Sequence, residues 1–452
     1  MKAVTNAQYI QLLLLHAGIA MAIYLAPAMA KFVLFSVVMF FLYYVISRGN
    51  KNDEVLIAAA YIMGFEVFSR MTGGALSYEF AKYSVIGFLT LGMFYKGFNT
   101  KSWPYVFFIV FLIPGILFSA INLNYESSVV QAIAFNLSGP ISLAISALYC
   151  YDRKMSWKRL QQILLAALLP MVAMTIYLYV YTPNIRDVLT GTQSNFAASG
   201  GFGPNQVATI LGLGMFILFT RLFTVRDLLV NIIDVSLLGL LTYRGIVTFS
   251  RGGIMTAAAC AAVFILLYFL QAKIRTKAVM MPKLIAIGGV ILVTWIITSV
   301  STLGLIDKRY ANQDAAGRTK GDITTGRLEL IDEEMEAFYK YPLTGIGVGK
   351  VREYRQAQTG RFSNTHNEVT RILSEHGLFG LLGMLILIVT PLIFRIRNRS
   401  NVLLFSFLAF WFLTINHSSM RIAAPSLIYG LALITIINVR KKNTIHRKQV
   451  RA

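Results

Sequence analysis

Four polar segments interrupt a chain of long apolar blocks, and the first places an arginine at the edge of one block. Ser250-Arg251-Gly252-Gly253 leads directly into apolar sequence. A guanidinium at membrane depth is costly, so it should face protein, water or an anionic partner. The alternative is an interfacial arginine whose side chain reaches the lipid headgroups. Arg251 is therefore a candidate for anion binding.

The second segment places an arginine at the start of a predicted helix. Thr324-Thr325-Gly326-Arg327 precedes residues with helical apolar spacing, and either threonine could be the N-cap. The helix dipole disfavours positive charge at this end. A bound phosphate would offset that penalty, because helix N-termini and arginine both favour anions. Arg327 is a second candidate for anion binding, and an ordinary solvated arginine is the alternative.

The third and fourth segments, residues 364–368 and 416–421, contain histidines among polar residues. His366 follows Asn364-Thr365, and a neutral imidazole there could act as a general base near neutral pH. A loop histidine is more often an ordinary surface residue, so both interpretations stay open. Secondary candidates for the same site are Asn205, Asn367, Glu375, His417 and Arg421.

Composition indicates the solvent that surrounds these segments. The chain has 452 residues, of which 56% are hydrophobic and only 14% charged. Soluble domains carry about 25% charged residues. The apolar blocks are close to the length at which a helix crosses the hydrocarbon of a bilayer, where the backbone must form its hydrogen bonds locally. The sequence predicts an all-α polytopic membrane protein, and its net charge of +22 reflects basic helix ends rather than a nucleic-acid partner.

The apolar blocks predict about 12–14 transmembrane helices. Two of the fourteen are weak, because one contains Glu66 and Arg70 and a glycine pair separates it from the other. The predicted spans are 8–27, 31–47, 55–70, 82–95, 104–121, 129–150, 160–182, 205–221, 228–244, 252–272, 284–303, 372–394, 401–417 and 422–439.

Charge in the connecting loops predicts the orientation. If the spans alternate, the short segments on the side of the amino terminus carry most of the Lys and Arg residues, which is typical of the cytoplasmic side. Both termini are then cytoplasmic. The predicted divisions are a helix bundle at 1–304, a periplasmic loop with amphipathic helices at 305–371, C-terminal transmembrane helices at 372–439 and a basic tail at 440–452.

The loop 305–371 is the one sizeable water-facing region. A helix is predicted from Arg327 to Tyr341-Pro342, with Leu328 and Phe338 on its apolar face, lying on the membrane or on the bundle. The glycine-rich residues 344–349 predict a flexible turn, not a nucleotide site, because no strand precedes them. A second helix should begin near residues 364–367. No strand and no metal-ligand spacing is evident, so neither metal nor cofactor is expected.

Taken in order, these motifs resemble the bacterial O-antigen ligase and O-antigen polymerase superfamily. The resemblance extends over roughly residues 200–385, and the flanks share only their membrane helices. The motifs that carry it are Phe202-Gly203-Pro204-Asn205, Ser250-Arg251-Gly252-Gly253, Thr325-Gly326-Arg327, the glycine-rich 345–349, Thr365-His366-Asn367 and Leu373-x-Glu375-x-Gly377.

The resemblance implies a membrane glycosyltransferase of GT-C-like architecture in the bacterial inner membrane. Its periplasmic site would move a glycan from undecaprenyl diphosphate to a hydroxyl acceptor, with inversion and without a metal. Arg251 and Arg327 would engage the donor diphosphate, and His366 would deprotonate the acceptor. The expected partners are the lipid-linked donor, a lipid A–core or glycan acceptor, and membrane lipids.

The resemblance leaves several activities open. Ligation of O-antigen to lipid A–core is preferred over polysaccharide polymerisation by a narrow margin. A protein O-oligosaccharyltransferase and a transporter of lipid-linked glycan are weaker alternatives. Transporters often show two related halves, and the sequence shows no such duplication. The sugar, the acceptor and the oligomeric state are not evident from the sequence.

Overall fold

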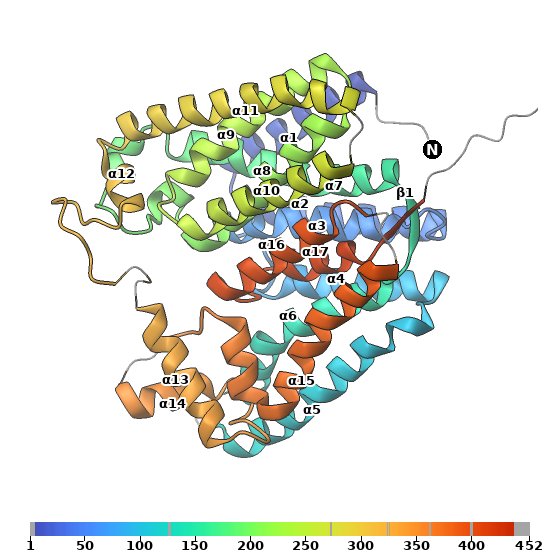
Figure 1. Ribbon diagram of the computed structural model, residues 1–452, viewed down its shortest axis with the longest axis vertical. Helices are drawn as coiled ribbons and strands as arrows, with labels where there is room; N and C mark the ends of the chain where they lie inside the picture. Colours follow the sequence, from blue (N-terminus) through green and yellow to red (C-terminus); the bar gives the residue numbers. More distant parts are fainter. Residues whose placement is uncertain are drawn as a thin grey trace, which may run out of the picture.

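The computed structural model describes residues 5–124, 128–271, 274–322, 324, 326–360, 363–397 and 401–437. Helices form nearly all of the regular structure in these residues, and they pack side by side over most of their length (Figure 1). Ten of them are long and apolar enough to cross a membrane. The predicted class, an all-α polytopic membrane protein, is confirmed.

A helix lies at each of the fourteen predicted spans. Those long and apolar enough to cross are α1 (Asn6–Leu25), α2 (Met29–Arg48), α5 (Trp103–Asn122), α6 (Val129–Cys150), α7 (Trp157–Tyr181), α8 (Pro204–Thr224), α9 (Leu228–Ile246), α10 (Arg251–Gln271), α11 (Ile274–Ser301) and α15 (Glu368–Arg397). The other four are α3 (Glu54–Met71), α4 (Phe80–Lys96), α16 (Leu404–His417) and α17 (Ala424–Ala432). Short 3₁₀ turns are η1 (Thr100–Ser102), η2 (Ile185–Val188) and η3 (Ala197–Ser199).

Helix α3 explains how its charges are accommodated. Its side chains are buried along almost the whole helix, Glu66 included, and Glu66 forms an ion pair with Arg70. Gly64 permits the close approach to α7, because a Cβ there would overlap the backbone of Ala167. The charges therefore face protein rather than lipid.

The expectations for the C-terminal span and for strands were wrong. The span 422–439 is only partly helical, because α17 ends at Ala432 and residues Thr435–Ile437 form strand β2. β2 pairs in parallel with β1 (Lys154–Ser156). The buried amide of Asn401 donates to the carbonyls of Leu431, Ala432 and Ile434, which satisfies groups left open where the helix ends. The tail 440–452 lies outside the described residues.

The long loop folds into three further helices. They are α12 (Leu305–Tyr310), α13 (Arg327–Lys340) and α14 (Val351–Thr359). In Figure 1 they lie at the end of the bundle opposite β1. Helix α13 packs on α15 and so rests on the bundle.

Helix α13 has the predicted limits but not the predicted cap or buried face. The N-cap is Gly326, with a φ of 78°, and Thr324 donates its hydroxyl to Asp322 instead; Thr325 lies outside the described residues. The fully buried positions are Glu334 and Ala337, because ionic contacts to α14 and a threonine of α15 select that face. Leu328, from the predicted apolar face, is 56% exposed.

The glycine-rich residues 344–349 form a buried turn, not the flexible one expected. The backbone N–H groups of Ile346 and Gly347 donate to the carbonyls of Ser374 and Glu375. Gly345 and Gly347 have positive φ and lie against backbone atoms, where a Cβ would overlap. The turn thus packs on α15 directly before its kink at Gly377.

Candidate functional site

The connection between α9 and α10 fixes the position of Arg251. Ser250 donates its hydroxyl to the Oδ1 of Asn205 at 2.7 Å, and its backbone N–H donates to the hydroxyl of Thr248. Phe249 adopts a left-handed conformation, with a φ of 57°. Asn205, at the start of α8, therefore holds the turn from which Arg251 projects.

The two glycines after Arg251 permit close helix contacts. A Cβ on Gly252 would lie 2.5 Å from the ring of His417, and a Cβ on Gly253 would overlap the carbonyl of Ala208 in α8. Any side chain at Gly253 would push α10 away from α8. The pair of glycines thus brings α8, α10 and α16 together around Arg251.

Replacing Gly253 by alanine should therefore destabilise the protein. Overpacking of a close contact costs about 1–3 kcal/mol, which should lower the midpoint of thermal unfolding in detergent. Gly288→Ala in α11 is the matched control, because no described atom outside the local backbone of α11 lies within 4 Å of the added Cβ. Equal midpoints for the two variants would contradict the close packing of α8 and α10.

Arg251 lines a cavity of about 250 Å³ together with Arg309 and Arg327. We call this the arginine cavity. Its other walls include Ser194, Ser250 and Asn416, and no carboxylate side chain lines it within the described part of the chain. Three guanidinium groups thus share one small polar space whose described lining has no carboxylate side chain.

Burial and neighbouring positive charge lower the pKa of two of these arginines, Arg309 and Arg327. Burial, with the charges of Arg251 and Arg327 adding to it, lowers the pKa of Arg309. Burial and the charge of Arg251 likewise lower the pKa of Arg327. Arg309 donates from Nε to the carbonyl of Phe249 at 3.0 Å, and Arg251 donates to the carbonyl of Arg309 at 3.5 Å. Like charges held together in this way create a strong site for an anion.

Sequence reasoning missed Arg309. It lies in the polar run after α11, where nothing in its neighbours separates it from the other basic residues of the loop. Only the fold brings α12 against the turn at Phe249.

His366 lies beside the arginine cavity but not in its lining. Burial lowers the pKa of His366 to about 3, and the charges of Arg421, Arg327 and Arg355 contribute to the shift. Its Nδ1 is buried and has no hydrogen-bond partner among the described residues. The imidazole is therefore neutral at pH 7, and its Nδ1 is unpaired among the described residues.

The turn between α16 and α17 supports His366. The backbone N–H of Ser419 donates to the carbonyl of His366 at 3.1 Å, and Arg421 donates to the carbonyl of Thr365. Four buried charged side chains then hold this turn through its backbone. The contacts are Lys82 to the Met420 carbonyl, the Met420 N–H to Glu368, Arg70 to the Arg421 carbonyl and the Ala423 N–H to Glu66.

Comparison with known proteins reveals a family similarity in the central segment. Residues 236–385 match the family model described as O-antigen ligase. This segment is similar to the O-antigen ligase family, and we name it the O-antigen ligase domain after that similarity. The resemblance to the O-antigen ligase and polymerase superfamily is thereby confirmed, and the match supports a membrane glycosyltransferase of that type. No curated protein and no solved structure matches the chain significantly.

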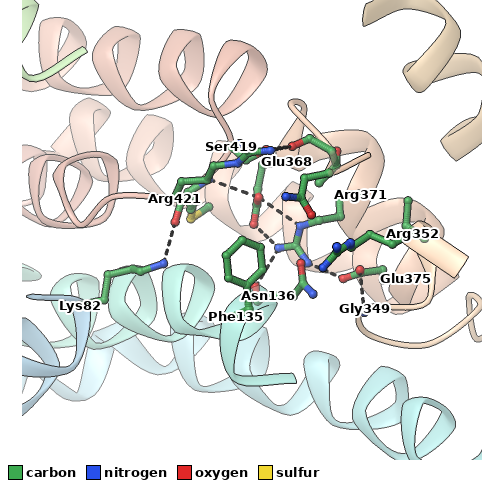
Figure 2. Close-up of a pocket in the computed structure, with 14 residues that line it drawn as sticks. Lys82, Phe135, Asn136, Gly349, Arg352, Glu368, Arg371, Glu375, Ser419 and Arg421 are labelled. Atoms are coloured by element: carbon green, nitrogen blue, oxygen red, sulfur yellow. Dashed lines mark hydrogen bonds and ion pairs between the residues drawn. The ribbon is translucent and has the colours of Figure 1, made fainter. Parts of the chain in front are cut away.

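The O-antigen ligase domain contains all three arginines of the cavity as well as His366 and Glu375. Glu375 does not line the arginine cavity. It pairs with Arg371 and accepts the N–H of Gly349 at 2.8 Å. Figure 2 shows Arg371 between Glu375 and Glu368, with Lys82 and Arg421 at the other side of the same pocket.

The remaining secondary candidates lie beside the site. Asn367 caps α15 by accepting the N–H of Val369, and its amide donates to Asn416, which lines the arginine cavity. His417 has its Nδ1 2.8 Å from the carbonyl of Leu413 and its Nε2 3.3 Å from the hydroxyl of Thr209. Both residues therefore join the arginine cavity to the neighbouring helices.

The described residues contain no group of three or more His, Cys, Asp or Glu side chains that could hold a metal ion. The carboxylates near His366 are instead paired with arginine or lysine, as for Glu368 with Arg371.

Proposed function

We propose that the protein transfers a glycan from undecaprenyl diphosphate to a hydroxyl acceptor at the periplasmic face of a bacterial inner membrane. O-antigen ligation to lipid A–core is the preferred reaction. The O-antigen ligase domain supports the reaction class. The observation that carries the proposal is the arginine cavity, where Arg251, Arg309 and Arg327 meet without a carboxylate in the described lining.

A diphosphate is the ligand that suits this cavity. Its oxygens accept charge-assisted hydrogen bonds, and arginine presents several donors in a planar fork. Negative charge on the diphosphate increases as the bond to the sugar breaks. Preorganised positive groups stabilise that charge and so lower the barrier to transfer.

His366 is the proposed base. The acceptor oxygen attacks the anomeric carbon, the bond from that carbon to the phosphate oxygen breaks, and the diphosphate leaves with the electron pair. The acceptor proton passes to the unpartnered nitrogen of the neutral imidazole. Attack from the face opposite the leaving group inverts the anomeric configuration. The neutral state of His366 and its place beside the arginine cavity support this role.

The pKa of His366 should depend on the donor. In the free protein nearby positive charge and burial hold its pKa at about 3, so the imidazole stays unprotonated throughout the neutral range. A bound diphosphate offsets the positive charge and should raise this pKa. We therefore expect kcat/KM to stay flat from pH 8 down to about 5, whereas kcat should begin to fall at a higher pH than kcat/KM.

Initial rates across this pH range, with the donor concentration varied, measure both profiles. A kcat/KM profile that falls near pH 6.5, the ordinary range of histidine, would show that the environment of the free His366 is not the one described here.

A transfer assay with purified protein tests the proposal. The donor is an undecaprenyl diphosphate-linked glycan of several repeats, and the acceptors are lipid A–core and a second copy of the lipid-linked glycan. Transfer of whole preformed chains to lipid A–core supports ligation. Ladders that grow by single repeats would assign polymerisation instead. Movement of donor across vesicle membranes without a new glycosidic bond would overturn the transferase assignment.

A further inference from the structure

A large apolar cavity lies among α1, α2, α3 and α7, away from the O-antigen ligase domain. Its volume is about 670 Å³. Apolar side chains such as Leu12, Val33 and Leu169 form most of its wall. Leu15 and Phe32, on α1 and α2, also line it and are 57% and 67% exposed. The cavity thus opens on a surface that would face acyl chains in a membrane.

One end of this cavity contains a buried arginine. Arg159 is 4% exposed and lines the wall with Tyr44 and Gln162. Its Nη1 donates to Gln162 at 3.1 Å, but its Nε and Nη2 have no hydrogen-bond partner among the described residues. A buried cation with unpaired donors is costly, so an anion that accepts from it would be stabilising.

The carboxylates nearest to Arg159 are already used elsewhere. Asp53 forms ion pairs with Lys96 and Arg153. Glu54 accepts from the backbone and side chain of Asn52. No described carboxylate lies within ion-pair distance of Arg159, although both add to the field around it.

A smaller polar cavity of about 200 Å³ adjoins the arginine end. It shares Gln162 and Leu165 with the apolar cavity. Its wall also contains Arg221, which is buried, and Lys158, which is exposed. Arg221 is paired with Asp234, so Lys158 is the cation that a ligand could reach. The combined site has an apolar chamber and a positively charged end.

This site lies far from the arginine cavity. Helix α8 carries Asn205 of the arginine cavity near its start and Arg221 and Thr224 of the polar cavity at its end. Its 21 residues span about 30 Å. The two sites are therefore at opposite ends of the bundle, and the charge distribution predicts the cytoplasmic leaflet for this one.

We propose that this cavity binds one anionic phospholipid. An acyl chain occupies the apolar chamber, and the phosphate accepts hydrogen bonds from Arg159, with Lys158 nearby. A soluble anion would not account for the apolar wall, and a lipid without net negative charge would leave the positive charge of Arg159 and Lys158 uncompensated. Basic pockets between helices at the cytoplasmic side are suited to anionic headgroups.

Native mass spectrometry of the full chain tests the site. Delipidated protein would be titrated with phosphatidylglycerol or phosphatidylcholine in detergent. We expect one phosphatidylglycerol to bind at least about tenfold more tightly than phosphatidylcholine, because the choline cation of phosphatidylcholine offsets its phosphate charge and is repelled by Arg159 and Lys158. Glycerol 3-phosphate at the same concentration should not compete.

Two variants test separately how the arginine end and the apolar chamber contribute to lipid affinity. Arg159→Gln should reduce the affinity for phosphatidylglycerol about tenfold, whereas Arg226→Gln, an exposed arginine of the same end outside both cavities, should not. Ser36→Trp should also reduce binding, because Ser36 is an exposed cavity residue and the indole would fill the chamber without removing charge. Equal binding of both lipids, unchanged binding by either cavity variant, or competition by glycerol 3-phosphate would overturn the proposal.

Discussion

Replacing His366 by glutamine should lower the turnover of glycan transfer by about 10²–10⁴-fold, the usual contribution of a positioned general base. Glutamine preserves polarity and approximate size but cannot accept the acceptor proton. The Nδ1 of His366 has no partner among the described residues, so the substitution leaves no known protein group unpaired. The measurement is the single-turnover rate of the purified variant with saturating lipid-linked donor.

The same variant provides its own control. Donor affinity and the midpoint of thermal unfolding should stay close to those of the unmodified protein, because the arginine cavity is unchanged. A variant with full turnover would exclude His366 as the base. Equal losses of donor affinity and turnover would assign it to donor binding instead.

Replacing Arg327 by glutamine should reduce turnover by about 10²–10³-fold, as expected for loss of one preorganised charge at a site where negative charge develops. The same substitution should not destabilise the protein. No hydrogen bond or ion pair joins the Arg327 side chain to a described residue, and burial and neighbouring positive charge lower its pKa. Removing the charge should therefore leave the midpoint of thermal unfolding unchanged or higher.

Arg318→Gln is the matched control for Arg327→Gln. Arg318 belongs to the same loop, but its side chain is 82% exposed and, among the described residues, pairs only with Asp314 at the surface. Exposed ion pairs contribute little, so activity and stability should both be retained. Loss of stability without loss of turnover in Arg327→Gln would mean that Arg327 has a structural role. Arg327→Lys should recover only part of the activity, because lysine lacks the planar fork.

Buried ion pairs around α15 bear on both predictions. Arg371 pairs with Glu368 and Glu375, and Glu368 also accepts from the backbone of Met420. Such pairs add little net stability, but removal of one partner leaves an uncompensated charge. Their effect in this protein is to orient the turn that contacts His366. The position of the site therefore depends on these ion pairs, whereas its charge does not.

Local patterns in the sequence predicted much of the helical framework. Apolar runs determine where helices form, because backbone groups in hydrocarbon must form their hydrogen bonds within the segment. A helix therefore lies at every predicted span, and α13 has the predicted limits. The sequence also predicted anion binding by Arg251 and Arg327, since a charge beside an apolar block or at a helix start requires compensation. The two arginines line one cavity, and their role in anion binding stays a prediction.

Only the tertiary structure decided which distant residues complete each site. Arg309 enters the arginine cavity because α12 folds against the turn at Phe249. The pairing of β1 with β2 and the hydrogen bond from Lys82 to the carbonyl of Met420 join residues hundreds of positions apart. Local sequence determines the apolar periodicity of a helix and the free-energy cost of exposing a charged side chain to lipid. Both effects depend only on residues close together in the chain. Contacts between distant segments depend on how all the helices pack at once, and no single segment encodes that arrangement.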